Sequence, residues 1–247
     1  PLDGLVFKSA FGPDLRYFRN GIYLDSSSAT RLGSTNYAKR SDERNFSWTW
    51  DNIINYTTTF HSIHKLSLMG LFSMQSGSTT KEYWDATDVM ENTNWWNLNS
   101  GEYNAKNSYN SYTENSMISY ALRANYSYKD CYLFTGTVRW DGSSKFAKNN
   151  RWGCFPSAAA AWRITEEPFM KDVNWLNNLK LRFAFGMTGN NDGIGDYATQ
   201  QVLEGPIYYS FGSVYSTGFY PSGIVNPNLK WEKSSEYNLG LDFGFLD

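Results

Sequence analysis

The chain has 247 residues, a formal net charge of -2 and an isoelectric point near 5.8, so it carries no basic field of the kind that binds nucleic acid. Aromatic residues make up 18% of it and mean hydropathy is -0.54, with no apolar run near the roughly 18 residues that a spanning helix needs. This composition favours strands and turns, and it leaves a membrane barrel open because barrel strands are only half apolar.

Eight segments alternate between apolar and polar side chains, which is the pattern of half-exposed β-strands. The alternation is clearest in FSWTWDNIINY, which sets Phe46, Trp48 and Trp50 against intervening polar residues. In chain order, the predicted strands are 2–11, 46–56, 65–75, 118–128, 131–141, 155–164, 179–188 and 231–245.

The predicted connections alternate between short and long. Those at 57–60 and 129–130 are short and 165–178 is moderate, whereas 12–43, 77–115, 142–151 and 189–229 are mostly long and rich in polar and aromatic residues. An outer-membrane barrel sorts its loops in this way, with short periplasmic turns and long extracellular loops. The pattern therefore favours a transmembrane antiparallel β-barrel over a soluble sandwich.

Aromatic residues also gather near the ends of the predicted strands, where a barrel meets the two membrane interfaces. A sandwich core with large rings is the alternative interpretation of the same content. The interfacial candidates are Tyr56, Phe60, Tyr126, Tyr128, Tyr132, Trp140, Trp152, Trp162 and Trp231.

One predicted strand consists mainly of small residues. Alternation places Ala158, Ala160 and Trp162 on one face, with Ser157, Ala159, Ala161 and Arg163 on the other. Small side chains on both faces suit a strand that other protein approaches closely, and we expect that approach on the lumen side.

The stretch around this strand resembles the SusC/RagA-type TonB-dependent transporters of the outer membrane. The family-like residues are RWDGSSKF (139–146), NRWGCFPS (150–157), AWRI (161–164) and TEEPFM (165–170). Two further stretches follow in the family's order, LKLRFAFGMTGNNDGIGDY (179–197) and VNPNLKWEKSSEYNLGLDFGFLD (225–247). Lys145 and Cys154 depart mildly from the pattern, which has arginine and an aromatic residue there.

The resemblance implies an all-β fold in which residues 1–247 form about eight strands of a roughly 22-stranded plugged barrel. Because the sequence starts at Pro1 and carries no signal peptide, we expect an internal segment, with the plug domain and the C-terminal end of the barrel absent. The resemblance further implies a Gram-negative outer membrane and contact with its lipid. It implies TonB-powered import of oligosaccharides or peptides with a SusD-like lipoprotein lid, without covalent chemistry on the substrate.

No catalytic, cofactor or metal constellation emerges from the residues, and we expect none. His61 and His64 flank a short turn without a ligating cluster, and Glu166 and Glu167 are adjacent in a turn, where we expect both to be solvated. The segment GNNDGIG (189–195) lacks the helix that a phosphate loop needs. We interpret Cys131 and Cys154 as incidental and expect no disulfide between them, because they belong to opposite ends of neighbouring strands.

Aromatic residues in the long loops are the candidates for ligand binding, because flat apolar rings beside Asn, Ser and Asp suit sugars or peptides. Packing among the loops or against a lid is the alternative role. We predict Trp95 and Trp96 as substrate-binding residues. The full set of loop aromatics is Tyr83, Trp84, Trp95, Trp96, Tyr208, Tyr209, Phe211, Tyr215, Phe219 and Tyr220.

Two other function classes remain open from the residues alone. A secreted or surface β-sandwich could bind glycans through the same aromatics, and it would stay monodisperse without detergent. A glycan-cleaving enzyme would need two carboxylates whose replacement abolishes hydrolysis, and the sequence nominates no such pair.

Overall fold

The computed structural model describes residues 3–245, and they are almost entirely strands and loops. The long strands are β1 (Leu5–Leu24), β2 (Tyr37–Phe60), β3 (His64–Thr87), β5 (Tyr109–Tyr128), β6 (Tyr132–Ser143), β7 (Trp152–Arg163), β8 (Leu176–Asn190) and β11 (Glu232–Phe245). Shorter elements are η1 (Leu98–Ser100), β4 (Glu102–Tyr103), η2 (Lys148–Asn150), η3 (Ile164–Glu166), η4 (Pro168–Met170), β9 (Leu203–Phe211) and β10 (Val214–Pro221). Within residues 3–245, no helix is long and apolar enough to cross a membrane.

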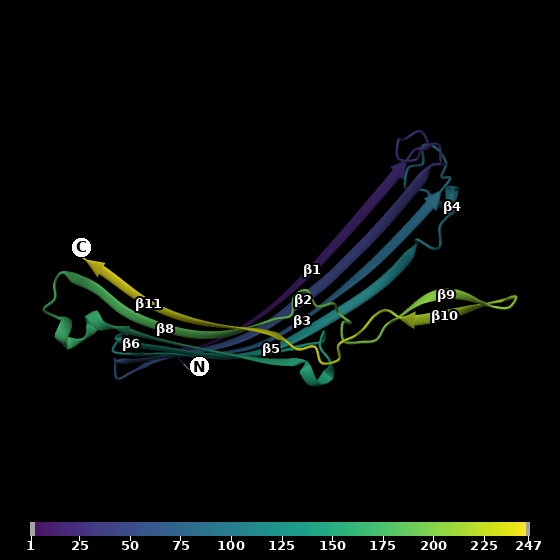
Figure 1. Cartoon of the computed structure of the whole chain (residues 1–247). Coiled ribbons are helices and arrows are strands. Elements are labelled where there is room, and N and C mark those ends of the chain that lie inside the picture. The colour runs from purple at the N-terminus through teal and green to yellow at the C-terminus, as the bar shows by residue number, and fades with distance from the viewer. Residues whose placement is uncertain (1–2, 246–247) are drawn as a thin grey trace. The chain divides into compact units, whose positions relative to one another are not determined.

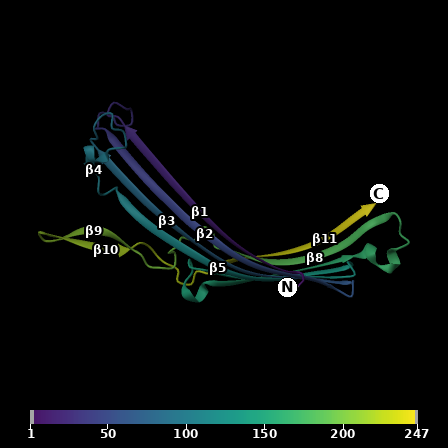
Figure 2. The same cartoon turned by 180° about the vertical axis from the view of Figure 1, so that it is seen from behind.

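The eight long strands form one sheet in chain order, β1-β2-β3-β5-β6-β7-β8-β11, and β4 adds to β3 (Figures 1 and 2). The predicted all-β meander of eight strands is therefore confirmed. The other sheet among the described residues is the β9–β10 hairpin, which lies beyond the ends of β8 and β11. A sandwich needs two long sheets packed face to face, so the sandwich alternative is not the fold of these residues.

The chain divides into two compact units. The first contains Pro1–Phe11, Trp50–Met74 and Ser116–Asp247, and the second contains Gly12–Thr49 and Gln75–Asn115. Strands β1, β2, β3 and β5 contribute residues to both. We had predicted loops over 12–43 and 77–115, and this is wrong in part, because residues 12–24, 37–43, 77–87 and 109–115 are strand.

Antiparallel pairing in the first unit places apolar and polar rows on opposite faces of the sheet. Directly paired residues project to the same face, and successive residues along a strand alternate. One row runs Ala124, Gly136, Ala158, Phe185 and Tyr237 across five strands. The next row, on the opposite face, runs Asn125, Thr135, Ala159, Ala184 and Asn238.

The apolar face of the first unit is largely uncovered. Tyr237, Leu239 and Phe243 of β11 are 72%, 75% and 60% exposed, which is unusual for side chains of this size. A face of this kind suits contact with lipid, whereas the polar face suits contact with water or with other protein.

A small cluster of buried aromatic rings lies in the first unit. Trp231 contacts Phe146 and Phe155, with ring centroids 5.0 and 5.4 Å apart, and its Nε1 donates a hydrogen bond to the Arg151 carbonyl at 2.8 Å. Trp231 is only 9% exposed. Its expected place at a membrane interface is therefore wrong, because its ring instead anchors the loops between β6 and β7 and between β8 and β11.

Candidate functional site

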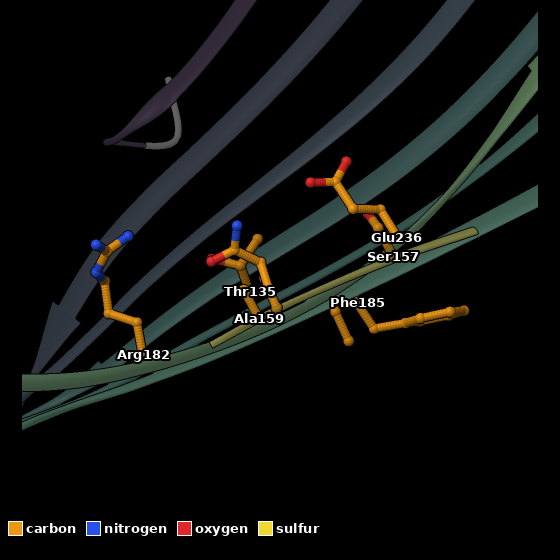
Figure 3. Close-up of a pocket in the computed structure, with 10 residues that line it drawn as sticks. Thr135, Ser157, Ala159, Arg182, Phe185 and Glu236 are labelled. Carbon is orange, nitrogen blue, oxygen red and sulfur yellow. The ribbon is translucent and has the colours of Figure 1, made fainter. Parts of the chain in front are cut away.

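A shallow hollow of about 410 Å³ lies on the polar face of the first unit (Figure 3). Thr135, Ser157 and Glu236 point into it, whereas Phe185 points to the other side of the sheet. Arg182 stands at its margin and donates a 2.7 Å hydrogen bond to Asp242. Small and apolar side chains line most of the hollow, and its polar groups are Thr135, Ser157, Glu236, Asn238 and one compensated ion pair.

The floor of this hollow explains the small residues of β7. Ala159 pairs with Ala184, and Ser157 pairs with Gly186, so adjacent strands present short side chains at the same level. A Cβ added to Gly186 would meet no atom within 4 Å. The small residues therefore leave space on the polar face, and the expected approach of other protein on the lumen side stays a prediction.

The second unit holds four of the aromatics that the sequence nominated, and two of them, Tyr83 and Trp84, lie on β3 and not in a loop. Trp95 and Trp96 stack with ring centroids 3.9 Å apart at 26°. Trp96 is 63% exposed, whereas Trp95 packs over Gly21 of β1, where an added Cβ would lie 1.9 Å from the Trp95 ring. The pair is therefore anchored through Trp95 and offers Trp96 to solvent.

Both tryptophans line a pocket of about 250 Å³. Its remaining lining residues are Arg40, Trp84, Asn97, Leu98, Asn99 and Tyr103. An adjoining pocket of about 270 Å³ shares Trp84 and Tyr103 and is otherwise lined by Glu82, Tyr83, Ser108, Tyr109 and Asn110. Aromatic side chains line both hollows, so Trp95 and Trp96 lie where a ligand could bind.

Ion pairs and buried hydrogen bonds hold the strands that carry this pocket. The Asp42 carboxylate accepts hydrogen bonds from Arg19 Nε at 2.8 Å and from Arg40 Nη2 at 2.5 Å. The buried Asp85 carboxylate accepts hydrogen bonds from the Tyr37 hydroxyl at 3.0 Å and from Asn107 at 3.1 Å. Arg40 has no signal of its own in the sequence, because a charged residue in YAKRSDERN is indistinguishable from a solvated one without its partners.

The remaining loop aromatics lie mostly in the β9–β10 hairpin. Val214 pairs with Phe211 and Tyr215 pairs with Ser210. Tyr208, Phe211 and Tyr215 are 69%, 69% and 82% exposed, so both strands of the hairpin present uncovered rings. An isolated two-stranded hairpin is only marginally stable in water, and such a surface suits a partner that covers it.

His64, beside the short turn between β2 and β3, has structural partners for its ring. His64 Nδ1 lies 2.7 Å from the Tyr126 hydroxyl, and its ring stacks on Phe60 with centroids 4.8 Å apart.

Among residues 3–245, no cluster of His, Cys, Asp and Glu is suited to hold a metal. Cys131 and Cys154 are both free thiols.

The two adjacent glutamates behave differently from each other. Glu166 is exposed and pairs with Arg163 at 3.2 Å, whereas Glu167 accepts hydrogen bonds from the Tyr132 hydroxyl at 2.5 Å and from Trp162 Nε1 at 3.0 Å. Both bonds favour the ionised carboxylate, and the bond from Tyr132 has the larger effect. The pKa of Glu167 therefore lies below its ordinary value of 4.5. The expectation that Glu167 is simply solvated is therefore wrong.

The open meander with sorted loops, one apolar face and one polar face defines part of a transmembrane β-barrel wall. Residues 3–247 match the family described as "TonB dependent receptor-like, beta-barrel", and the chain belongs to this family.

Named relatives agree with this assignment. The TonB-dependent receptor SusC of Bacteroides thetaiotaomicron is 37% identical over 98% of this chain, and the TonB-dependent receptor P3 of Formosa agariphila is 33% identical over all of it. The chain spans 24% of the length of each. The SusC/RagA-type resemblance of the sequence is thereby confirmed.

Solved structures agree on the fold. A structure of the RagAB peptide transporter matches 99% of this chain with a TM-score of 0.80 at 24% identity, and the match covers 27% of that chain. The RagAB peptide importer in its 'open-open' state matches with a TM-score of 0.79, also at 24% identity, over 99% of this chain and 26% of that chain.

Proposed function

We propose that this chain is part of the barrel of a TonB-dependent importer in the outer membrane of a Gram-negative bacterium. The observation that carries the proposal is the family match over residues 3–247 together with the uncovered apolar face of the sheet. In this proposal, residues 1–247 supply eight strands of a roughly 22-stranded barrel. Its plug domain and remaining strands belong to a longer protein, in line with the 24% of each relative that the chain spans.

The polar and apolar faces take different roles in this mechanism. The apolar rows contact outer-membrane lipid, and the polar hollow beside Ser157 and Ala159 faces the lumen, where the plug and the passing substrate lie. Energy reaches the plug through TonB at the inner membrane, and movement of the plug opens the lumen. The substrate crosses without covalent change, so the protein acts as a transporter and not as an enzyme.

We propose oligosaccharides or peptides as the cargo and a SusD-like surface lipoprotein as the lid. Support for peptides comes from structural similarity to a transporter whose description names them, whereas oligosaccharides are what the SusC/RagA-type resemblance of the sequence implies. Support for the lid comes from the β9–β10 hairpin, whose uncovered rings suit a protein partner. Trp95 and Trp96 would contact the cargo in the loops.

The test uses the full-length protein in its native membrane. A strain lacking the gene, and one lacking the gene for a SusD-like lid, are compared with the parent for uptake of fluorescent oligosaccharides and peptides. We expect both deletions to abolish uptake of one cargo class, and we expect the protein to run as a heat-modifiable band in outer-membrane fractions. Unchanged uptake in the deletion strain, or a soluble band that boiling does not shift, would contradict the proposal.

A further inference from the structure

The 250 Å³ pocket of the second unit has one charged residue among its described lining residues, Arg40. Its volume lies below the range of about 300–1,000 Å³ that encloses whole small ligands. It therefore suits one residue of a longer chain, and the adjoining 270 Å³ pocket offers room for the next. The inference below rests on the proposed function in oligosaccharide import and deepens it.

The charge around Arg40 is incompletely neutralised. Arg40 and Arg19 share the single carboxylate of Asp42, which leaves one net positive charge in this group of three. The Arg40 side chain is 27% exposed, and its guanidinium lies over the Trp84 ring, 5.6 Å from the centroid. A half-buried cation on an aromatic ring attracts a planar anion, because reduced solvation strengthens the interaction.

The other lining groups suit a sugar ring. Trp96 presents an exposed aromatic face, against which the C–H side of a pyranose can pack. Asn97 and Asn99 supply amide groups that both donate and accept hydrogen bonds, as sugar hydroxyls require. A guanidinium in the same pocket matches a carboxylate in two-pronged geometry.

The adjoining pocket carries the opposite charge. Glu82 is the one charged residue among its described lining residues, and the pocket shares the Trp84 and Tyr103 walls. A second carboxylate placed there would be repelled, whereas a neutral sugar would hydrogen-bond to Glu82, Ser108 and Asn110.

We propose that the Arg40–Trp96 pocket binds a uronic acid residue of an oligosaccharide and that the Glu82 pocket binds the neutral sugar linked to it. The transporter then selects chains in which acidic and neutral sugars alternate. Neutral glycans and continuous polyuronates bind more weakly, because the first lacks the carboxylate and the second places one beside Glu82.

The test measures binding by the full-length transporter with its lid, purified in detergent. The probes are an alternating uronate–neutral oligosaccharide, the same oligosaccharide with its carboxyls reduced to alcohols, and a polyuronate of equal length. Titration calorimetry is repeated with Arg40→Gln and Arg40→Lys, and with Arg44→Gln as the control, because Arg44 is an exposed cation of the same strand outside the pocket.

We expect the alternating oligosaccharide to bind the parent protein at least tenfold more tightly than either other probe, because a charged hydrogen bond is worth about 1.5–3 kcal/mol. Arg40→Gln should remove the preference over the reduced probe, Arg40→Lys should retain part of it, and Arg44→Gln should leave it intact. A heat-modifiable band confirms that each variant is folded. Trp96→Ala supplies a second test that does not disturb the Asp42 ion pairs, and it should weaken binding of all three probes.

The outcomes separate the two proposals. Equal binding of acidic and reduced probes, or an unchanged preference in folded Arg40→Gln, would overturn the uronate pocket while leaving oligosaccharide import standing. Binding of none of the three probes by a protein that still imports peptides would overturn the oligosaccharide cargo, and the uronate pocket with it.

Discussion

The long strands carry different side chains in the two units of the chain. In the first unit, apolar rows such as the one through Phe183 and Leu239 lie open on one face, opposite polar rows. In the second unit, β2 carries Arg40, Asp42 and Glu43, which form ion pairs with one another or with Arg19 and Lys81. The difference shows that an apolar row is not a requirement for extending a β-ladder.

The largest effect should come from placing a charge on the open apolar face. Leu239→Arg puts a guanidinium among Phe183 and Leu241, and an arginine on the lipid face costs about 2–4 kcal/mol at the bilayer midplane. We expect a severe loss of heat-modifiable full-length protein in outer membranes, measured by immunoblot.

The matched control is the preceding residue. Asn238→Arg adds the same charge to the polar face beside Glu236, where water and a carboxylate are available. It should leave the amount of assembled protein nearly unchanged. Equal losses for the two variants would mean that the faces are not divided between lipid and lumen.

The same contrast explains how far the sequence predicts the fold. Where one face is apolar, as in FSWTWDNIINY, alternation identifies the strand. In YAKRSDERN both faces are polar, so the sequence shows no alternation of apolar and polar residues. Backbone hydrogen bonds to the neighbouring strands, and ion pairs between residues distant in sequence, hold this strand instead. The β9–β10 hairpin was missed for a related reason: its rings occupy both faces, and Gly205 and Pro206 interrupt the pattern.

For the candidate site too, the sequence shows local features and not contacts between distant residues. Composition nominated Trp95 and Trp96, because aromatic rings in polar loops are conspicuous, and their role in binding stays a prediction. By contrast, β2 and β3 bring Arg40 beside Trp84, although the two residues lie far apart in the sequence. A pairing of this kind is tertiary and leaves no local signal.

In the second unit, removing a charged side chain should loosen the structure, whereas in the first unit the damaging change is to add one. Asp42→Ala removes the acceptor shared by Arg19 and Arg40, leaving two guanidiniums side by side. We expect faster limited proteolysis of the 25–36 loop, with the amount of assembled protein maintained. Asp14→Ala is the control, because its pair with Arg16 is exposed and screened by solvent, so its loss should have little effect. Identical proteolysis of both variants would show that the Asp42 pairs do not hold this region.

A smaller effect is expected from acid at the turn after β7. The pKa of Glu167 is lowered chiefly by the hydrogen bond from Tyr132, so its stabilising contribution is present above the ordinary value of 4.5 and is lost as pH falls through the lowered value. We expect the thermal transition of the purified protein to fall over this acidic window. Glu167→Gln should remove that part of the pH dependence, and Glu166→Gln should retain it. A pH profile that Glu167→Gln leaves unchanged would assign the transition to other groups.

The smallest and most local effect should come from substituting Gly21 of β1, whose missing side chain lets the Trp95 ring pack against the strand. A methyl group there would lie 1.9 Å from Cδ2 and 2.2 Å from Cε2 of Trp95, so Gly21→Ala forces the ring away from the strand. Trp96 stacks on Trp95 and must shift with it, which deforms the pocket while the ion pairs of β2 stay in place. Gly12→Ala adds the same methyl group to the same strand with no atom within 4 Å. We therefore expect Gly21→Ala alone to change tryptophan fluorescence and to weaken oligosaccharide binding, at unchanged assembly. If both variants behaved as the parent, Trp95 would not position Trp96. Trp84 on β3 and Tyr103 on β4 would then determine the shape of the pocket.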